Sequence, residues 1–124
     1  MFDHVIVDVT ELADSRALYE RALAPLGISV VMEFPDRCAF GAESGKPQFW
    51  LAARGTPSAR GIHLAFAAES RDAVDAFHRA ALAAGAADNG APGVRPQYHP
   101  SYYGAFVLDR DGNNVEAVHH GSFS

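Results

Sequence analysis

The sequence predicts an α+β fold of two βαβββ modules, whose strands form a half-barrel sheet around a cavity with the helices on its outer face. Three observations support this. The order of strand-like and helix-like segments in the first half of the chain recurs in the second. The glycines that end the two expected helices, Gly27 and Gly85, are 58 residues apart, and two strand histidines, His4 and His63, are 59 apart. This agreement indicates a duplicated unit, and a small sheet in one unit alone would leave a face uncovered.

The first module is expected at residues 1–53. Residues 2–9 alternate between apolar and mixed positions, which is typical of a half-buried strand. A helix should follow, with Asp14 or Ser15 as its N-cap and Gly27 after its last turn. Further strands are expected at residues 28–34, 37–40 and 48–53, separated by Pro- and Gly-containing turns.

The second module is expected at residues 61–120, after a linker at 54–60. A strand at 61–67 again alternates, and Ser70 is the expected N-cap of a helix that ends at Gly85. The remaining strands are expected at residues 86–96, 102–108 and 113–119, with Asp109-Arg-Asp-Gly112 as a hairpin turn between the last two.

Composition narrows the class of protein. The 124 residues are 48% hydrophobic and 20% charged, which predicts one folded domain over 1–124. A single cysteine excludes an internal disulfide and a cysteine zinc cluster, and the net charge of −5 argues against a general nucleic-acid binder. No apolar run approaches the roughly 20 residues of a membrane span. We therefore expect a cytoplasmic protein that binds a small molecule, without nucleic-acid or membrane partners.

The alternation also predicts which side chains face the cavity. Apolar positions should pack beneath the helices: Val5, Val7 and Val9 in the first module, and Ile62, Leu64 and Phe66 in the second. His4 and His63 then point into the cavity, and Glu116 on the last strand does so too. Two imidazoles and one carboxylate suit one divalent ion such as Fe, Mn, Ni or Zn, with positions left for substrate. The alternative is that each is an ordinary strand residue.

The βαβββ pair resembles the vicinal oxygen chelate superfamily, which includes glyoxalase I, extradiol dioxygenases, fosfomycin-resistance enzymes and bleomycin-binding proteins. The most specific stretch is Tyr102-Tyr-Gly-Ala-Phe-Val-Leu-Asp-Arg-Asp-Gly-Asn-Asn-Val-Glu-Ala-Val118, which is similar to the closing hairpin of the family and its final carboxylate ligand. Asp3-His4-Val5 and Gly61-Ile-His63-Leu resemble the two histidine-bearing strands. The resemblance covers essentially the whole chain and implies that His4, His63 and Glu116 are metal ligands.

One departure from the family pattern bears on the reaction. Glyoxalase I carries a second glutamate on the fourth strand, where this chain has Gln48-Phe-Trp-Leu51. Without that carboxylate, the resemblance implies a metal-dependent lyase, dioxygenase or transferase that is a poor lactoylglutathione lyase. Gln48 and Trp50 would face the cavity and contact substrate, although Trp50 is equally well explained as core.

A proline-bounded loop supplies further candidates. Tyr98, His99 and Tyr103 should lie at the cavity mouth, where His99 and Tyr103 could act as general acid or base and Tyr98 could stack on a substrate. The simpler alternative is that these rings fill a gap beneath the loop.

Two functions are compatible with these residues. The first is a divalent-metal-dependent enzyme that chelates two neighbouring oxygens of a small oxygen-rich substrate. The second is a metal-free protein that sequesters a drug, for which the negative charge would favour a cationic ligand. The intact set of three ligands favours the enzyme. A homodimer is expected because the family pairs its chains and half-barrels leave sheet edges that need cover.

Overall fold

The computed structural model describes residues 1–55 and 62–121 of the chain. The first module contains β1 (Val5–Asp8), α1 (Leu12–Leu23), the short 3-10 helix η1 (Ala24–Leu26), β2 (Ser29–Phe34), β3 (Arg37–Gly41) and β4 (Phe49–Ala52). The second contains β5 (His63–Ala67), α2 (Arg71–Ala83), β6 (Ala87–Val94), β7 (Tyr103–Leu108) and β8 (Asn114–His119). Most of the expected linker, from residue 56 on, lies outside the described residues, as does Gly61. In the described part, no helix is long and apolar enough to cross a membrane.

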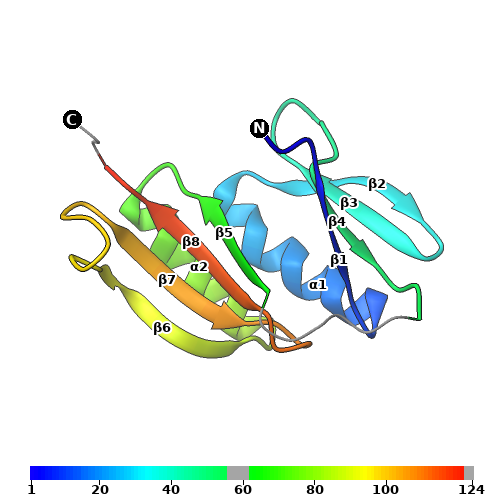
Figure 1. The fold of residues 1–124 in the computed structure, drawn as a ribbon. Coiled ribbons are helices and arrows are strands. Elements are labelled where there is room, and N and C mark those ends of the chain that lie inside the picture. Colours follow the sequence, from blue (N-terminus) through cyan, green and yellow to red (C-terminus); the bar gives the residue numbers. More distant parts are fainter. Residues whose placement is uncertain (56–61, 122–124) are drawn as a thin grey trace.

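The strands form two separate four-stranded sheets with the same topology. Their orders are β1-β4-β3-β2 and β5-β8-β7-β6, and in each the first strand runs parallel to the last while the other pairs are antiparallel. Figure 1 shows the second sheet at the left, the first at the right and α1 between them. The predicted α+β fold of two βαβββ modules is confirmed. The sheets, however, do not close into a barrel around one cavity.

The two helices join the modules into a single core. Helix α1 packs against α2 as well as against its own sheet, and α2 also packs against η1. One apolar cluster therefore contains Leu18 and Leu23 from α1, Phe77 from α2 and side chains of both sheets. Because each helix covers one face of its sheet, the other face of each sheet is left open.

The register prediction is largely confirmed. Val7 and Val9 are buried, at 1% and 3% exposure. Ile62, Leu64 and Phe66 are half-buried and pack against the core. Val5 is the exception: it is 38% exposed, because it lies on an edge strand beside a pocket between the two sheets.

The helix ends agree with the sequence at three points and differ at one. Ser70 caps α2 by accepting a hydrogen bond from the Ala73 amide at 3.0 Å. Gly27 and Gly85 adopt φ values of +76° and +107°, a region that favours glycine. The expected cap of α1 at Asp14 or Ser15 was wrong, since the helix already begins at Leu12 and Ser15 is buried within it.

A buried aspartate organises the last hairpin and connects it to the first module. One oxygen of Asp109 accepts hydrogen bonds from the Asp111 and Asn113 amides, both at 2.9 Å. The other accepts from the Asn113 side chain at 3.0 Å and from the Tyr19 hydroxyl of α1 at 2.6 Å. Burial and the Asp109 charge raise the pKa of Tyr19, so its hydroxyl stays a donor. The Asp-x-Asp-Gly-Asn pattern thus sets the turn that leads into β8.

Replacing Tyr19 with phenylalanine removes this contact between the modules. Asp109 then loses a buried donor, so we expect Tyr19→Phe to lower the free energy of unfolding by about 1–3 kcal/mol. Urea denaturation measures the change. Tyr98→Phe is the matched control, since Tyr98 is 63% exposed, and it should change stability by less than about 0.5 kcal/mol. Equal effects of the two variants would contradict this role for Tyr19.

Candidate functional site

A histidine–glutamate pair lies on the open face of the second sheet. His63 on β5 and Glu116 on the neighbouring strand β8 have Nε2 and Oε1 2.7 Å apart. The two strands are parallel, and Ala65 lies opposite Glu116. Because His63 is two residues before Ala65, the side chains of His63 and Glu116 project from the same face of the sheet. The Glu116 side chain is 2% exposed, whereas that of His63 is 51% exposed. A buried carboxylate is therefore joined to an imidazole that solvent can reach.

A tyrosine that the sequence analysis did not select completes this cluster. The Tyr102 hydroxyl donates a hydrogen bond to the second oxygen of Glu116, and its ring packs edge-on against His120. Burial is the main cause that raises the pKa of Tyr102, and the hydrogen bond to the Glu116 carboxylate raises it further. Gly104 leaves room for the contact, because a Cβ there would lie 3.1 Å from the Tyr102 ring and 3.3 Å from Glu116 Oε2.

A pocket of about 340 Å³ lies on the same face of the second sheet. Its lining consists of Asn89, Gly90, Arg95, Tyr98, Phe106 and Asn114. The Phe106 ring lies 6.1 Å from the His63 ring, and the Asn89 side chain donates to the Asn114 side chain at 3.1 Å. The pair and the pocket are therefore neighbours through Phe106. Tyr98 lines the pocket, and its contact with a substrate stays a prediction.

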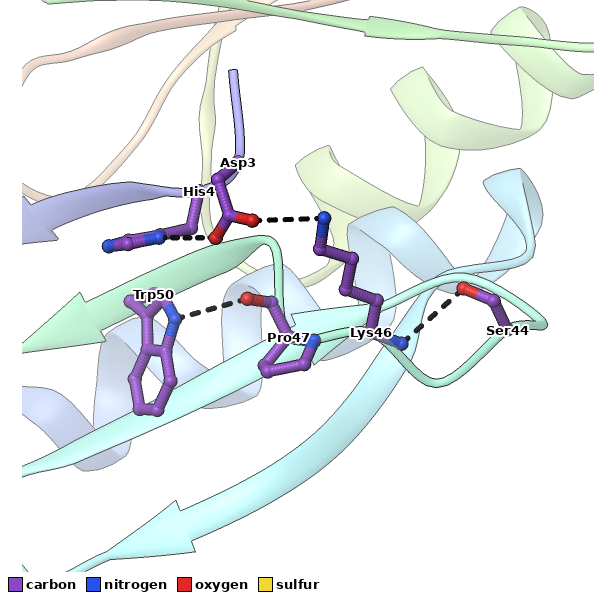
Figure 2. Close-up of polar contacts among 6 residues, drawn as sticks. All are labelled: Asp3, His4, Ser44, Lys46, Pro47 and Trp50. Carbon is purple, nitrogen blue, oxygen red and sulfur yellow. Dashed lines mark hydrogen bonds and ion pairs between the residues drawn. The ribbon is translucent and has the colours of Figure 1, made fainter. Parts of the chain in front are cut away.

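His4 does not join His63 and Glu116 within one chain. Its Nδ1 lies 2.8 Å from an Asp3 oxygen, and the other Asp3 oxygen pairs with the Lys46 ammonium at 3.0 Å (Figure 2). The His4 contact and the Lys46 charge lower the pKa of Asp3. Among residues 1–55 and 62–121, no three His, Cys, Asp or Glu side chains are placed to hold a metal ion. The expectation of convergence inside one chain was wrong, because the open faces belong to two separate sheets.

The first sheet carries the two predicted substrate contacts at different places. Trp50 is half-buried on the face it shares with Ile6, donates from Nε1 to the Pro47 carbonyl at 3.2 Å and stacks on Phe34. Gln48 instead lines an apolar pocket of about 270 Å³ between the two sheets, which contains none of the three predicted ligands.

The two predicted catalytic residues, Tyr103 and His99, have different surroundings. Tyr103 donates to Asp75 of α2 at 2.6 Å and has the Arg71 guanidinium over its ring, so it points toward the helix and away from Glu116. The strand alternation could have shown this, because Ala105 and Val107 of the same strand are buried and Tyr102 has the opposite parity. The His99 ring accepts a hydrogen bond from the Ser101 amide at 3.0 Å, and its catalytic role stays a prediction.

Comparison with known proteins identifies the family of this chain. The family model described as Glyoxalase/Bleomycin resistance protein/Dioxygenase superfamily matches residues 1–117. The chain belongs to this superfamily. No curated protein matches at a significant level.

Solved structures of the glyoxalase superfamily share the fold over the full chain. A glyoxalase/bleomycin resistance protein from Albidiferax ferrireducens T118 is 32% identical, with a TM-score of 0.84 and coverage of 98% of this chain and 99% of that one. A glyoxalase/bleomycin resistance protein/dioxygenase family enzyme from Burkholderia phytofirmans PsJN is 20% identical, with a TM-score of 0.75 and coverage of 96% and 98%. A lactoylglutathione lyase from Agrobacterium tumefaciens is 18% identical, with a TM-score of 0.70 and coverage of 96% and 92%. The last two show the fold alone.

The contact between Tyr102 and Glu116 can be measured as a coupling energy. We expect the variants Tyr102→Phe, Glu116→Gln and their combination to give a coupling of about 1–3 kcal/mol, since the acceptor is a buried carboxylate. Urea denaturation of the four proteins provides the cycle. Additive effects would contradict the contact.

Proposed function

We propose that this protein is a divalent-metal-dependent enzyme of the vicinal oxygen chelate type, located in the cytoplasm and acting on a small oxygen-rich substrate. The observation that carries the proposal is the pairing of buried Glu116 with accessible His63 beside a polar pocket. Burying a carboxylate costs several kcal/mol unless it is paired or coordinates a cation. An imidazole and a carboxylate are also donors that Fe, Mn, Ni and Zn accept.

The third ligand of the proposed site is His4 of a second copy. Within one chain, His4 directly precedes β1 and shares the alternation of Ile6, which is exposed on the open face of the first sheet, whereas the pair lies on the open face of the second. The first open face is also apolar, with Ile6, Met32 and Phe34 exposed at 43%, 39% and 39%. Exposed apolar patches of this kind favour association. A homodimer in which these two faces meet would cover the patch, enclose the pocket and bring His4 toward His63.

The residues of this chain have separable tasks in the proposed site. A bound divalent ion would supply Lewis acidity to two neighbouring substrate oxygens. The Tyr102 hydrogen bond holds Glu116 in one orientation, and Gly104 allows that bond to form. The pocket side chains would hold the rest of the substrate, and the second copy would exclude water from it.

Metal binding tests the proposal. The metal-free protein is expected to bind one Mn²⁺ or Ni²⁺ per chain, and His63→Ala should weaken binding by about 10–100-fold or more. Isothermal titration on protein made without a histidine tag measures this. His78→Gln is the control, because His78 pairs with Asp88 on the helix side of the second sheet. Undiminished binding by His63→Ala would overturn the assignment.

A mixing experiment tests whether the site spans two copies. His4→Ala and Glu116→Ala should each abolish tight binding alone. Co-expressed with separate tags and purified on both, the two chains would give mixed dimers in which one of the two sites is intact, so about half of the sites should bind metal. No recovery would contradict a site shared between copies.

A metal-free drug-binding protein is the second candidate. The apolar pocket of about 270 Å³ between the sheets favours it, since such a pocket suits an apolar ligand. The net charge of −5 would favour a cationic one. Equilibrium dialysis with a cationic apolar dye separates the two functions: the drug-binding protein would bind the dye without metal and fail the metal titration.

We also predict weak lactoylglutathione lyase activity. Strand β4 carries no carboxylate that could act as the general base. Glu33 is ion-paired to Arg16 at the surface, and Tyr103 faces α2, so neither is placed to replace it. Lacking a general base, the metal-loaded protein should isomerise the methylglyoxal–glutathione hemithioacetal about 10²–10⁴-fold more slowly than an efficient lyase. The absorbance of the thioester product measures the rate. Rapid turnover would show that another group supplies the base.

A further inference from the structure

We propose that Arg95 is the binding residue for the carboxylate of a flat, unsaturated or aromatic organic acid on the open face of the second sheet. The inference deepens the proposed function by naming the substrate class, and it rests on that function only for the reaction that follows binding. Four features of the pocket support it: the space made for the guanidinium, its missing counter-charge, the rings around it and the phenylalanine that contacts both Arg95 and His63.

Strand β6 is shaped to accommodate the guanidinium. One nitrogen of Arg95 donates to the Ala91 carbonyl at 2.7 Å. A Cβ at Gly93 would lie 3.0 Å from the other terminal nitrogen, and a Cβ at Gly90 would lie 3.4 Å from the first. The guanidinium therefore lies across a glycine-lined stretch of strand, in an orientation that larger residues there would obstruct.

The positive charge of Arg95 has no carboxylate partner in the described part of the chain. Among the described arginines, Arg16, Arg37, Arg54 and Arg110 each lie within 4.0 Å of an Asp or Glu oxygen. Arg95 forms no such pair with a described residue, and neither do Arg21, Arg71 and Arg79, but Arg95 lines a pocket. In a protein with a net charge of −5, this unneutralised arginine lines a pocket together with the amides of Asn89 and Asn114. A guanidinium presents a planar set of donors that matches a carboxylate in a bidentate geometry.

Aromatic rings define the body of the expected ligand. The Arg95 guanidinium lies 5.5 Å from the centre of the Phe106 ring, which lines the same pocket. Tyr98, 63% exposed, also lines the pocket, and its ring lies 5.1 Å from that of Tyr102. Flat ligands pack against such rings in offset or edge-on arrangements. The pocket therefore favours a conjugated or aromatic acid over a branched aliphatic one.

The same phenylalanine connects this pocket to the proposed reaction centre. The Phe106 ring lies 6.1 Å from the His63 ring and 5.5 Å from the Arg95 guanidinium. A ligand whose carboxylate contacts Arg95 would therefore place its far end beside His63 and Glu116. The order carboxylate, flat body, oxygen-bearing end describes a substrate that the proposed enzyme could bind at both ends.

Benzoate and its neutral analogue benzamide test the inference on the metal-free protein. We expect benzoate to bind and to shift the side-chain Nε–Hε signal of Arg95 in NMR spectra. Benzamide should bind at least about tenfold more weakly, because it cannot form charge-assisted hydrogen bonds. Arg95→Gln should weaken benzoate binding by a similar factor. Equal binding of benzoate and benzamide, or unchanged binding by Arg95→Gln, would overturn the inference.

Two further variants make the result specific. Arg71→Gln is the matched control, because Arg71 also lies over an aromatic ring, that of Tyr103, but belongs to α2 and so lies on the helix side of the second sheet. It should leave benzoate binding unchanged, and a loss equal to that of Arg95→Gln would count against the site. Gly93→Ala keeps Arg95 but displaces its guanidinium, so it should weaken benzoate binding while thermal stability changes little.

The outcome is separable from that of the metal titration. Benzoate binding that depends on Arg95 in a protein that binds no metal would support this inference and contradict the proposed enzyme. Metal binding that depends on His63 and Glu116, together with benzoate binding that does not depend on Arg95, would support the proposed enzyme and contradict this inference.

Discussion

The packing of α1 against α2 determines where this protein can act. Each four-stranded sheet needs cover for its apolar face, and one helix per module supplies it. Because the helices also pack on each other, the two modules share a core and their other faces remain open. Val7, Leu51 and Phe77 are almost fully buried in this core, whereas His4 and His63 lie on the open faces. The chemistry of the chain is therefore distributed over two surfaces.

The hairpin between β7 and β8 connects that core to the candidate site. At its turn, Asp109 binds its own loop and Tyr19 of the first module. Further along β8, Glu116 is buried between His63 and Tyr102. One short segment thus contributes both to the contact between the modules and to the polar cluster. This explains why its sequence is the most distinctive in the chain without requiring every polar residue in it to be a ligand.

Sequence periodicity predicted the modules and the buried face of most strands, and it could not predict how the modules pack. Alternation placed His63 and Glu116 on one face, where they lie 2.7 Å apart. It also contained the signal for Tyr102, whose parity matches Gly104 and not buried Ala105. The separation of His4 has no such signal, because a pattern of apolar positions does not show which helix will cover which sheet. The orientation of Arg95 depends on space at two glycines, which becomes visible only in three dimensions.

The central claim is that two copies of this chain complete one metal site from opposite modules. Anomalous diffraction from a crystal of the protein soaked with Mn²⁺ tests it most directly. The account predicts one Mn²⁺ peak per chain, at a position coordinated by His63 and Glu116 of one copy and by His4 of another. A peak bounded by residues of one chain only, or no peak near Glu116 at saturating Mn²⁺, would contradict it.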